Sequence, residues 1–430
     1  MPIWVVPQEL YDTLLSQFYR LGQEFFILSK ERMPTMNNNA YYTRALELKD
    51  EIIANRRTFH GYAELGFDLP KTVAKVMEEL RSYGYEPQLC GKAGVTCTVG
   101  NGGKVLLLRG DMDALPMAEE SGLPFASTGK SCHSCGHDAH TAMLLGAAKM
   151  LKENEANLKG TVKFMFQPAE ELLGGALDMI ENGILENPRV DAGFGMHIRV
   201  ATDISRVGTV AYSRGPANFS GDMIRITCIG KDCHGSRPDL GIDAINIAAH
   251  IVIALQEVLA REIPCTENSV LLVGKIEGGT SCNTQAGKCV LEVSVRTTDQ
   301  VKRTFLKNRV KEIAEGTALT FRGKAEVEFV YGIAPMVNNE DMSDEIGSYC
   351  RDFLGEENVY VVPTSNGTED FSAVAERIPT TYLSLGCGSI ADGYTYGGHN
   401  PHMKLDEEAF PIGAALYAYA ATRYLEKHAE

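Results

Sequence analysis

The stretch Leu106-Leu107-Leu108-Arg109-Gly110-Asp111-Met112-Asp113 carries most of the information about the fold. Its apolar run is typical of a strand that is buried on both faces, and the run ends in two carboxylates. A second stretch, Phe164-Met165-Phe166-Gln167-Pro168-Ala169-Glu170-Glu171, repeats this pattern with another carboxylate pair. In open parallel sheets, functional sites form beyond the carboxyl ends of the strands, so we expect both pairs to border one crevice.

Segments with helical and strand patterns alternate around these two stretches. Residues 71–83 show an amphipathic helical pattern, and strands are predicted at 95–99 and 105–108, joined by a glycine-rich turn at 100–103. A further helix is predicted at 139–151, between the two apolar strands. This alternation predicts an α/β fold with a mainly parallel sheet that is flanked by helices.

The pattern changes after residue 212. The predicted elements there are strand 223–229, helix 242–259, strands 269–277 and 289–296, helix 301–315 and strand 325–329. Strand–helix–strand–strand–helix–strand is the order of a ferredoxin-like α+β unit. We therefore predict an N-terminal extension of uncertain role at residues 1–43. The main domain is expected in two pieces, 44–212 and 331–430, and the inserted domain at 213–330.

The composition restricts the class of protein. The 430 residues include 41 Lys and Arg against 56 Asp and Glu, which gives a net charge of -15. Clustered positive charge is needed to bind nucleic acid or an anionic membrane, so neither partner is expected, whereas a small anionic substrate remains compatible. No stretch approaches the ~18 uninterrupted apolar residues of a membrane span. Because the 11 Cys are spread along the chain and no secretory signal is recognised, we expect a cytoplasmic location.

The densest group of reactive side chains is Cys132-His133-Ser134-Cys135-Gly136-His137-Asp138-Ala139-His140. A Cys-x-x-Cys pair is typical either of a redox dithiol or of a metal site. A dithiol does not need three neighbouring histidines, whereas a divalent metal binds thiolate and imidazole together. The group therefore favours a metal site, and a Cys/His-rich loop without any ligand role is the alternative.

Two further histidines and the carboxylate pairs add ligands of the same kind. His197 ends the predicted strand around 192–196, and His399 lies in the glycine-rich loop 394–401. Each histidine alone would more often be a packed residue than a ligand. Together these groups supply N, S and O atoms suited to zinc or manganese. In each carboxylate pair, one member can bind a metal while its neighbour takes a proton from water whose pKa the metal lowers towards ~7.

Residues 44–423 resemble the metallopeptidase family of aminoacylases, carboxypeptidases and N-acyl-amino-acid amidohydrolases. Within that family, the closest similarity is to the branch of indole-acetyl-amino-acid hydrolases, hippurate hydrolases and N-acetyl-diaminopimelate deacetylases. The similarity rests on ten segments in the same order as in the family. They are RRTFHGYAELGF, RGDMDALP, SCGHDAHTAMLLGAA, FQPAEE, MHI, HGSRPDLGIDAI, EGGTSCN, SVRT, TEDFS and GGHNP.

The resemblance implies a role for residues of the main domain. It identifies that domain as the catalytic one, and it implies five metal ligands: Cys135, His137, Glu171, His197 and His399. Five ligands fit a site for two divalent ions, with Zn or Mn expected and Co or Ni as further options. Glu170 matches the general base and acid of the family. Asp113 matches a carboxylate that orients a ligand and so fixes the imidazole tautomer.

The resemblance also implies a role for the inserted domain, as a lid and dimerisation domain. His234 matches a histidine that the family presents to the substrate, often across a dimer. Asn283 and Arg296 match residues that hold substrate oxygens or a carboxylate. Judged from the residues alone, a turn cap would be the better interpretation of His234, and a surface strand end that of Arg296. Asn283 is followed by Thr-Gln where the family usually has an apolar residue and proline, so the conformation of this loop stays open.

The sequence therefore predicts a metal-dependent amidohydrolase that cleaves the amide bond of N-acyl amino acids, as a homodimer or higher homo-oligomer. A dipeptidase or carboxypeptidase acting at the same site, on a short peptide, is the nearest alternative. An alternative of another class is a non-catalytic metal-binding protein, although such a protein has no need of Glu170 beside Glu171. A serine hydrolase is disfavoured because no G-x-S-x-G motif is found.

Overall fold

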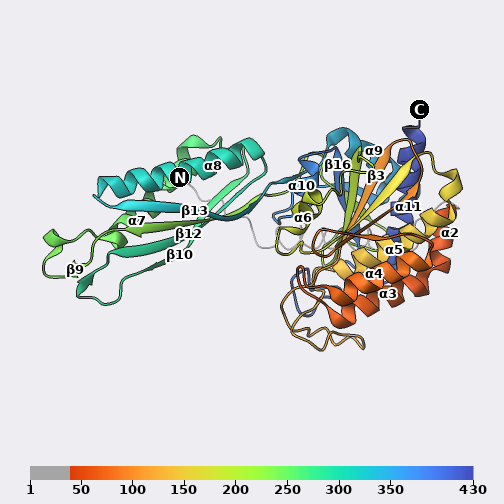
Figure 1. Ribbon diagram of the computed structural model, residues 1–430, viewed down its shortest axis with the longest axis horizontal. Helices are drawn as coiled ribbons and strands as arrows, with labels where there is room; N and C mark the ends of the chain where they lie inside the picture. Colours follow the sequence, from red (N-terminus) through yellow and green to blue (C-terminus); the bar gives the residue numbers. More distant parts are fainter. Residues whose placement is uncertain (1–38, 430) are drawn as a thin grey trace, which may run out of the picture.

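The computed structural model describes residues 39–429, which form a large and a small domain (Figure 1). Most of the predicted N-terminal extension, residues 1–38, lies outside the described residues. The large domain is built on an eight-stranded sheet in the order β1-β2-β4-β3-β5-β16-β6-β15. Its strands are β1 (Gln88–Cys90), β2 (Gly94–Gly100), β3 (Val105–Asp111), β4 (Thr161–Gln167), β5 (Ala192–Arg199), β6 (Val210–Tyr212), β15 (Val359–Val361) and β16 (Thr380–Gly386).

The centre of this sheet is parallel. Strand β3 pairs in parallel with β4 and β5, and β5 pairs in parallel with β16. Every residue of β3 and β4 is buried, as the apolar runs predict for strands covered on both faces. The edges differ, because β1–β2, β2–β4 and β6–β16 are antiparallel. The α/β fold with a mainly parallel sheet is thus confirmed.

Strands β2 and β3 are joined through the turn at 100–103, as predicted, but they do not pair with each other. Strand β4 lies between them and pairs antiparallel with β2 and parallel with β3. The burial pattern gives the physical reason. Residue Thr98 of β2 is exposed, whereas β3 is buried throughout, so β3 needs a neighbour on both sides and helices on both faces.

Helices cover both faces of the large sheet. Those packed in the main core on one face are α2 (Ala40–Glu47), α3 (Lys49–Tyr62), α4 (Pro70–Ser82), α5 (His137–Glu153), α9 (Glu340–Leu354) and α11 (Ala409–Lys427). A smaller core on the other face contains α6 (Gly175–Glu181) and α10 (Ser372–Ala375). Helix α5 begins directly at the dense Cys/His segment, so its N-terminus lies at the carboxyl end of the parallel strands.

The small domain has the predicted element order. Its antiparallel sheet has the order β10-β12-β8-β13, and α7 (Ala244–Ala254) and α8 (Gln300–Thr320) pack on it to form a separate core. Its strands are β8 (Gly221–Ile229), β10 (Ser269–Gly278), β12 (Lys288–Thr297) and β13 (Lys324–Ile333). A short ribbon of β9 (Cys233–His234) and β11 (Thr284–Gln285) lies at the end that is farthest from the large domain (Figure 1).

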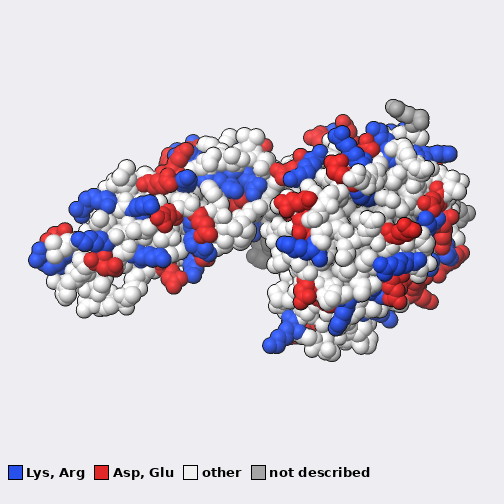
Figure 2. All heavy atoms as spheres, viewed as in Figure 1, with Lys and Arg blue, Asp and Glu red and all other residues white. Residues whose placement is uncertain are grey.

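The two domains are joined by two adjacent segments. Strand β7 (Pro216–Asn218) leads into the small domain, β14 (Met336–Val337) leads out of it, and the two pair antiparallel. We call this pair the connecting ribbon. On the face shown in Figure 2, basic and acidic side chains alternate over both domains.

One helical segment of the described chain, Ala244–Glu262, is long and apolar enough by composition to cross a membrane. It comprises α7 and a π-helical segment, Val258–Glu262. Its buried residues, among them Ile247 and Ile251, belong to the core of the small domain. A core helix of this kind passes the same test of length and composition.

Candidate metal centre

The dense Cys/His segment places two side chains at the N-terminus of α5. Cys135 precedes the helix, His137 is its first residue, and Gly136 lies between them with a φ of 89°. A Cβ atom at Gly136 would lie 2.6 Å from Cγ1 of Ile198. Glycine is therefore required both by the left-handed backbone and by the close approach of β5. This turn directs the thiol and the imidazole towards the ends of the central strands.

The carboxyl ends of three neighbouring strands supply the next groups. Asp113 follows β3, and Glu170 and Glu171 follow β4. The two carboxylate oxygens of Asp113 accept hydrogen bonds from the backbone N–H groups of Glu170 (3.0 Å) and Glu171 (3.2 Å). His197 lies near the end of β5. The predicted convergence of the two apolar stretches on one crevice is thus present in the structure.

His399 reaches this crevice from the loop before α11. Its φ of 62° is in the left-handed region, which is uncommon for a residue other than glycine and is typical of functional positions. Its backbone N–H donates to the carbonyl of Ser134 at 2.7 Å, next to Cys135. Its Nε2 lies 3.5 Å from Oε1 of Glu171. The structure thus brings together all five residues that the sequence analysis named as ligands.

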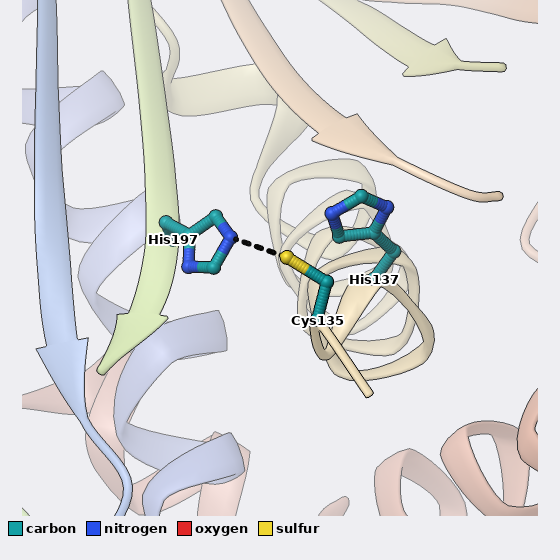
Figure 3. A group of neighbouring side chains, drawn as sticks. All are labelled: Cys135, His137 and His197. Carbon is teal, nitrogen blue, oxygen red and sulfur yellow. Dashed lines mark hydrogen bonds between the residues drawn. The ribbon is translucent and has the colours of Figure 1, made fainter. Parts of the chain in front are cut away.

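The five side chains form two groups that share one sulfur. Potential ligand atoms of Cys135, His137 and His197 lie within 4.8 Å of one another (Figure 3), and so do those of Cys135, Glu171 and His399. Sγ of Cys135 is 3.3 Å from Nε2 of His197. Each group offers three donors of the kinds that zinc and similar ions bind. The shared thiolate makes the arrangement suitable for two neighbouring ions.

Several buried polar atoms in this cluster fit metal binding because they have no hydrogen-bond partner in the described structure. They are both ring nitrogens of His137 and Oε1 of Glu171. Leaving buried polar atoms unsatisfied is costly, and a cation would satisfy them. In His197, Nδ1 lies 2.6 Å from the carbonyl of Ile198, so this nitrogen carries the proton and Nε2 presents its lone pair to the cluster.

The charges of the cluster shift its proton affinities. Burial raises the pKa of the Cys135 thiol, but the neighbouring His137 and His197 outweigh burial and lower the pKa to about 6. Hydrogen bonds to Cys135 and Glu171 raise the pKa of His399 to about 10. The thiol is therefore readily available as a thiolate, the form that binds metals.

Glu170 differs from its neighbour in both position and proton affinity. Burial and the carboxylates of Glu369 and Asp370 raise the pKa of Glu170 well above its ordinary value. For Glu171, burial raises the pKa, but His399 and His137 lower it overall. Two adjacent carboxyl groups with pKa values shifted in opposite directions can take different roles, one as a proton carrier and one as an anionic ligand.

A buried network below Glu170 was missed by the sequence analysis. Arg109 is fully buried, and its guanidinium contacts Asp111 at 2.8 Å and Glu369 at 2.8 Å. The hydroxyl of Tyr382 donates to Glu369. Asp111 in turn contacts His137 and His140. In the sequence, this network is indicated only by the adjacent carboxylates of RGDMD and TEDFS. The sequence does not reveal that Arg109 and Glu369 pair.

The cluster opens into a cavity of about 550 Å³ between the two domains. Cys135, Glu170, Glu171, His197 and His399 line it on the large domain, whereas Arg296 lines it from β12 of the small domain. The Nη1 of Arg296 donates to the carbonyl of Asn366 at 3.2 Å. Arg199, two residues beyond His197, also lines the cavity and was not named by the sequence analysis.

The structure does not bring the other two residues of the small domain to this cavity. His234 lies in β9, at the far end of the small domain, and Asn283 directly precedes β11. The backbone N–H of Gly235 donates to the carbonyl of Asn283 at 2.7 Å, so the two segments are adjacent. Neither His234 nor Asn283 lines the cavity of its own chain. The predicted contact of these two residues with the substrate is therefore absent from the described chain.

Comparisons with known proteins identify relatives that match most of this chain. N-acetylcysteine deacetylase of Bacillus subtilis is 34% identical over 398 residues, which is 91% of this chain and 99% of that protein. IAA-amino acid hydrolase ILR1-like 4 of Arabidopsis thaliana is 35% identical over 391 residues, which is 87% of this chain and 86% of that protein.

Among solved structures, the Bacillus subtilis YXEP protein, described as a dinuclear metal binding peptidase from the M20 family, superposes with a TM-score of 0.76. It is 31% identical, and the match covers 89% of this chain and 99% of that protein. A family model, "Peptidase family M20/M25/M40", matches residues 107–423. The resemblance stated from the sequence is confirmed, and the chain belongs to peptidase family M20/M25/M40.

Proposed function

We propose that this protein is a metal-dependent amidohydrolase that cleaves the amide bond of N-acyl amino acids. The observation that carries this proposal is the pair of ligand groups that share Cys135, with Glu170 beside them. The relatives support it, since one is named N-acetylcysteine deacetylase and another IAA-amino acid hydrolase.

The proposed metal site holds two divalent ions. Cys135, His137 and His197 would hold one, and Cys135, Glu171 and His399 the other, with Zn or Mn as the expected metals. Removing the ions with a chelator should abolish turnover, and adding Zn or Mn should restore it. Elemental analysis of the purified protein should find about two ions per chain. Full activity after complete removal of metal would disprove the proposal.

Metal ions held by the five ligand residues would supply Lewis-acid chemistry, which would polarise the amide carbonyl and lower the pKa of water. Glu170 accepts a proton from the attacking water and delivers it to the nitrogen of the leaving amine. Its raised pKa suits the second step, because a carboxyl group that holds its proton firmly can carry it to the leaving group. Asp113 positions Glu170 and Glu171 through their backbone N–H groups. Arg296 attracts the free carboxylate of the amino-acid half.

The role of Glu170 is tested by Glu170→Gln, which keeps the shape of the side chain and removes its proton-carrying group. We expect kcat to fall by ~10²–10⁴, as for the loss of general acid–base catalysis, while the metal content stays unchanged. Glu181→Gln, at an exposed position of α6, is the matched control and should keep full activity. Near-full activity of Glu170→Gln would refute the assigned role.

We further propose that the active form is a homodimer joined through the small domain. Strand β10 is an edge strand of the small sheet and exposes Val270, Leu272 and Ile276. Helix α7 next to it exposes Ile253. An apolar edge strand is a ready template for pairing with a second copy. Such a dimer offers a route for His234 and Asn283 of one chain to reach the other chain's cavity.

The alternative of a dipeptidase or carboxypeptidase is supported by the peptidase description of the family and of the YXEP protein. A substrate panel separates the two activities. Amino-acid release from acetyl, benzoyl and indole-acetyl conjugates should exceed release from dipeptides with the same C-terminal residue. The opposite order of kcat/KM would favour the peptidase.

A further inference from the structure

Arg199 is the last residue of β5. His197 and Arg199 are two positions apart, and alternate residues of a strand project to the same face. Arg199 is therefore on the same side of the sheet as the candidate ligand His197, about 7 Å further along the strand. Both residues line the cavity. The guanidinium thus belongs to the wall of the cavity beside the metal centre.

Arg199 has no anionic partner within the described structure. Its side chain is half-buried, yet among residues 39–429 no carboxylate lies within 4.0 Å of its nitrogens. The buried arginines of the large domain are different, since Arg56 contacts Asp138 at 2.8 Å and Arg109 contacts three carboxylates.

An unpaired guanidinium in a partly desolvated wall is costly unless a ligand pairs with it. Arginine is also the side chain best suited to recognise a carboxylate, because its planar fork can donate two parallel hydrogen bonds. The second unpaired guanidinium of the cavity, Arg296, comes from the small domain and contacts one backbone carbonyl. The cavity therefore presents two separate cationic groups, one from each domain.

We infer that the cavity selects N-acyl amino acids with two carboxylates, one held by Arg296 and the second by Arg199. This inference rests on the proposed function and specifies its substrate class. The second carboxylate could come from an acidic amino-acid side chain or from a dicarboxylic acyl group. Both sources present the same chemistry to a guanidinium, so the experiment contains an arm for each.

The test compares kcat/KM of the metal-loaded protein on pairs of substrates that differ by one charge. The first pair is N-acetyl-glutamate against N-acetyl-glutamine, and the second is N-succinyl-leucine against its succinamide analogue, which keeps only the carboxylate of leucine. We expect the diacid to be preferred by roughly tenfold or more in at least one pair, as for a charge-assisted bidentate contact. A ratio near one in both pairs would overturn the inference.

The variant Arg199→Gln removes the charge. In the pair where the diacid is preferred, it should lower the ratio of the two kcat/KM values by roughly tenfold or more. Arg199→Lys keeps the charge without the planar fork, so its ratio should fall between those of the other two proteins. The matched control is Arg206→Gln, because Arg206 donates to Asn358 and does not line the cavity. Its ratio should equal that of the unchanged protein. A preference that persists in Arg199→Gln would contradict the inference.

The outcomes separate this inference from the proposed function. Turnover of the monocarboxylate substrates without any preference for diacids would leave the amidohydrolase proposal in place and refute the role of Arg199. Absence of turnover on every N-acyl amino acid, diacid or monocarboxylate, would refute the proposed function and the inference with it. Raising the salt concentration should reduce the ratio in the unchanged protein, because the contact is ionic and reaches solvent.

Discussion

His60 lies between two carboxylates in the core of the large domain. Its Nδ1 is 2.7 Å from Oδ2 of Asp138, and its Nε2 is 3.0 Å from Glu119. Burial lowers the pKa of His60, but these carboxylates raise it above its ordinary value overall. A pKa raised by folding means that the protonated imidazole stabilises the native state. This contribution is complete below pH ~6.5 and is lost as the pH rises through the folded-state pKa.

We therefore predict that His60→Gln destabilises the protein more at pH 6 than at pH 9. At pH 6 the substitution leaves the largely buried Glu119 without its cation and Asp138 with Arg56 alone, at a cost of about 3 kcal/mol. Urea unfolding at both pH values measures the difference. His250→Gln, an exposed position of α7, serves as the control and should show a small effect at both pH values. An equal loss at pH 6 and pH 9 would show that His60 is neutral in the native state.

The dense Cys/His segment indicated a metal site from its residues alone, whereas the resemblance was needed to name the individual ligands. It is the resemblance that identified Cys135, His137 and His197, because a single histidine at a strand end is more often a packed residue. Arg199 was missed because its distinctive property is the absence of a partner, which only the folded chain reveals. His234 and Asn283 were matched by resemblance, but the sequence does not state which chain's cavity they face.

The packing of α11 against α5 depends on a small residue in α11. A Cβ atom at Gly413 would clash with Sδ of Met143 on α5 and would lie 2.8 Å from Cδ2 of Leu385 on β16. We predict that Gly413→Ala destabilises the protein by about 1–2 kcal/mol, because overpacking outweighs the better helix propensity of alanine. Differential urea unfolding measures this change.

The matched control is the same substitution at Gly316 of α8. Gly316 is exposed, and no atom lies within 4 Å of the position that its Cβ would take. Gly316→Ala should therefore stabilise the small domain by about 0.5–1 kcal/mol through helix propensity alone. If both variants were more stable than the unchanged protein, the close packing of α11 on α5 would not exclude a side chain at position 413.

The helices and strands were easier to predict from the sequence than the order of the strands in the sheet. The apolar run of β3 identified a strand that is buried on both faces, and the element order of the small domain identified its topology. The place of β4 between β2 and β3 was not predictable from the local turn, because sheet order is determined by which strands must be covered on both sides. Helices α2 and α3 are separated at Leu48, a position that no breaker residue in the sequence marks.

At the scale of the whole molecule, β9 lies far from the metal centre of its own chain, and this separation leads to a prediction about assembly. If His234 acts in the cavity of a partner, a chain with Glu170→Gln and a chain with His234→Ala complement each other. A mixed dimer then contains one complete site, formed by Glu170 of one chain and His234 of the partner subunit. Random mixing in equal amounts should restore about a quarter of the activity of the unchanged dimer.

The control for this experiment mixes His234→Ala with a chain that carries both substitutions. No pairing of these chains assembles a complete site, so their activity should stay at the level of the separate variants. Size-exclusion chromatography with light scattering establishes the oligomeric state in each mixture. Recovery in the control, or none in the complementary pair, would contradict the proposed sharing of His234 between chains.

The connecting ribbon gives the two arginines of the cavity a variable separation. Because β7 and β14 lie side by side, the small domain is attached along one line, and two adjacent extended segments bend more easily than they stretch. Arg296 turns with the small domain, whereas Arg199 stays with β5. A change in the hinge angle therefore alters the span between the guanidiniums. A homologous series of diacids would act as a molecular ruler, in which the best-fitting carbon chain reports how far the hinge is closed.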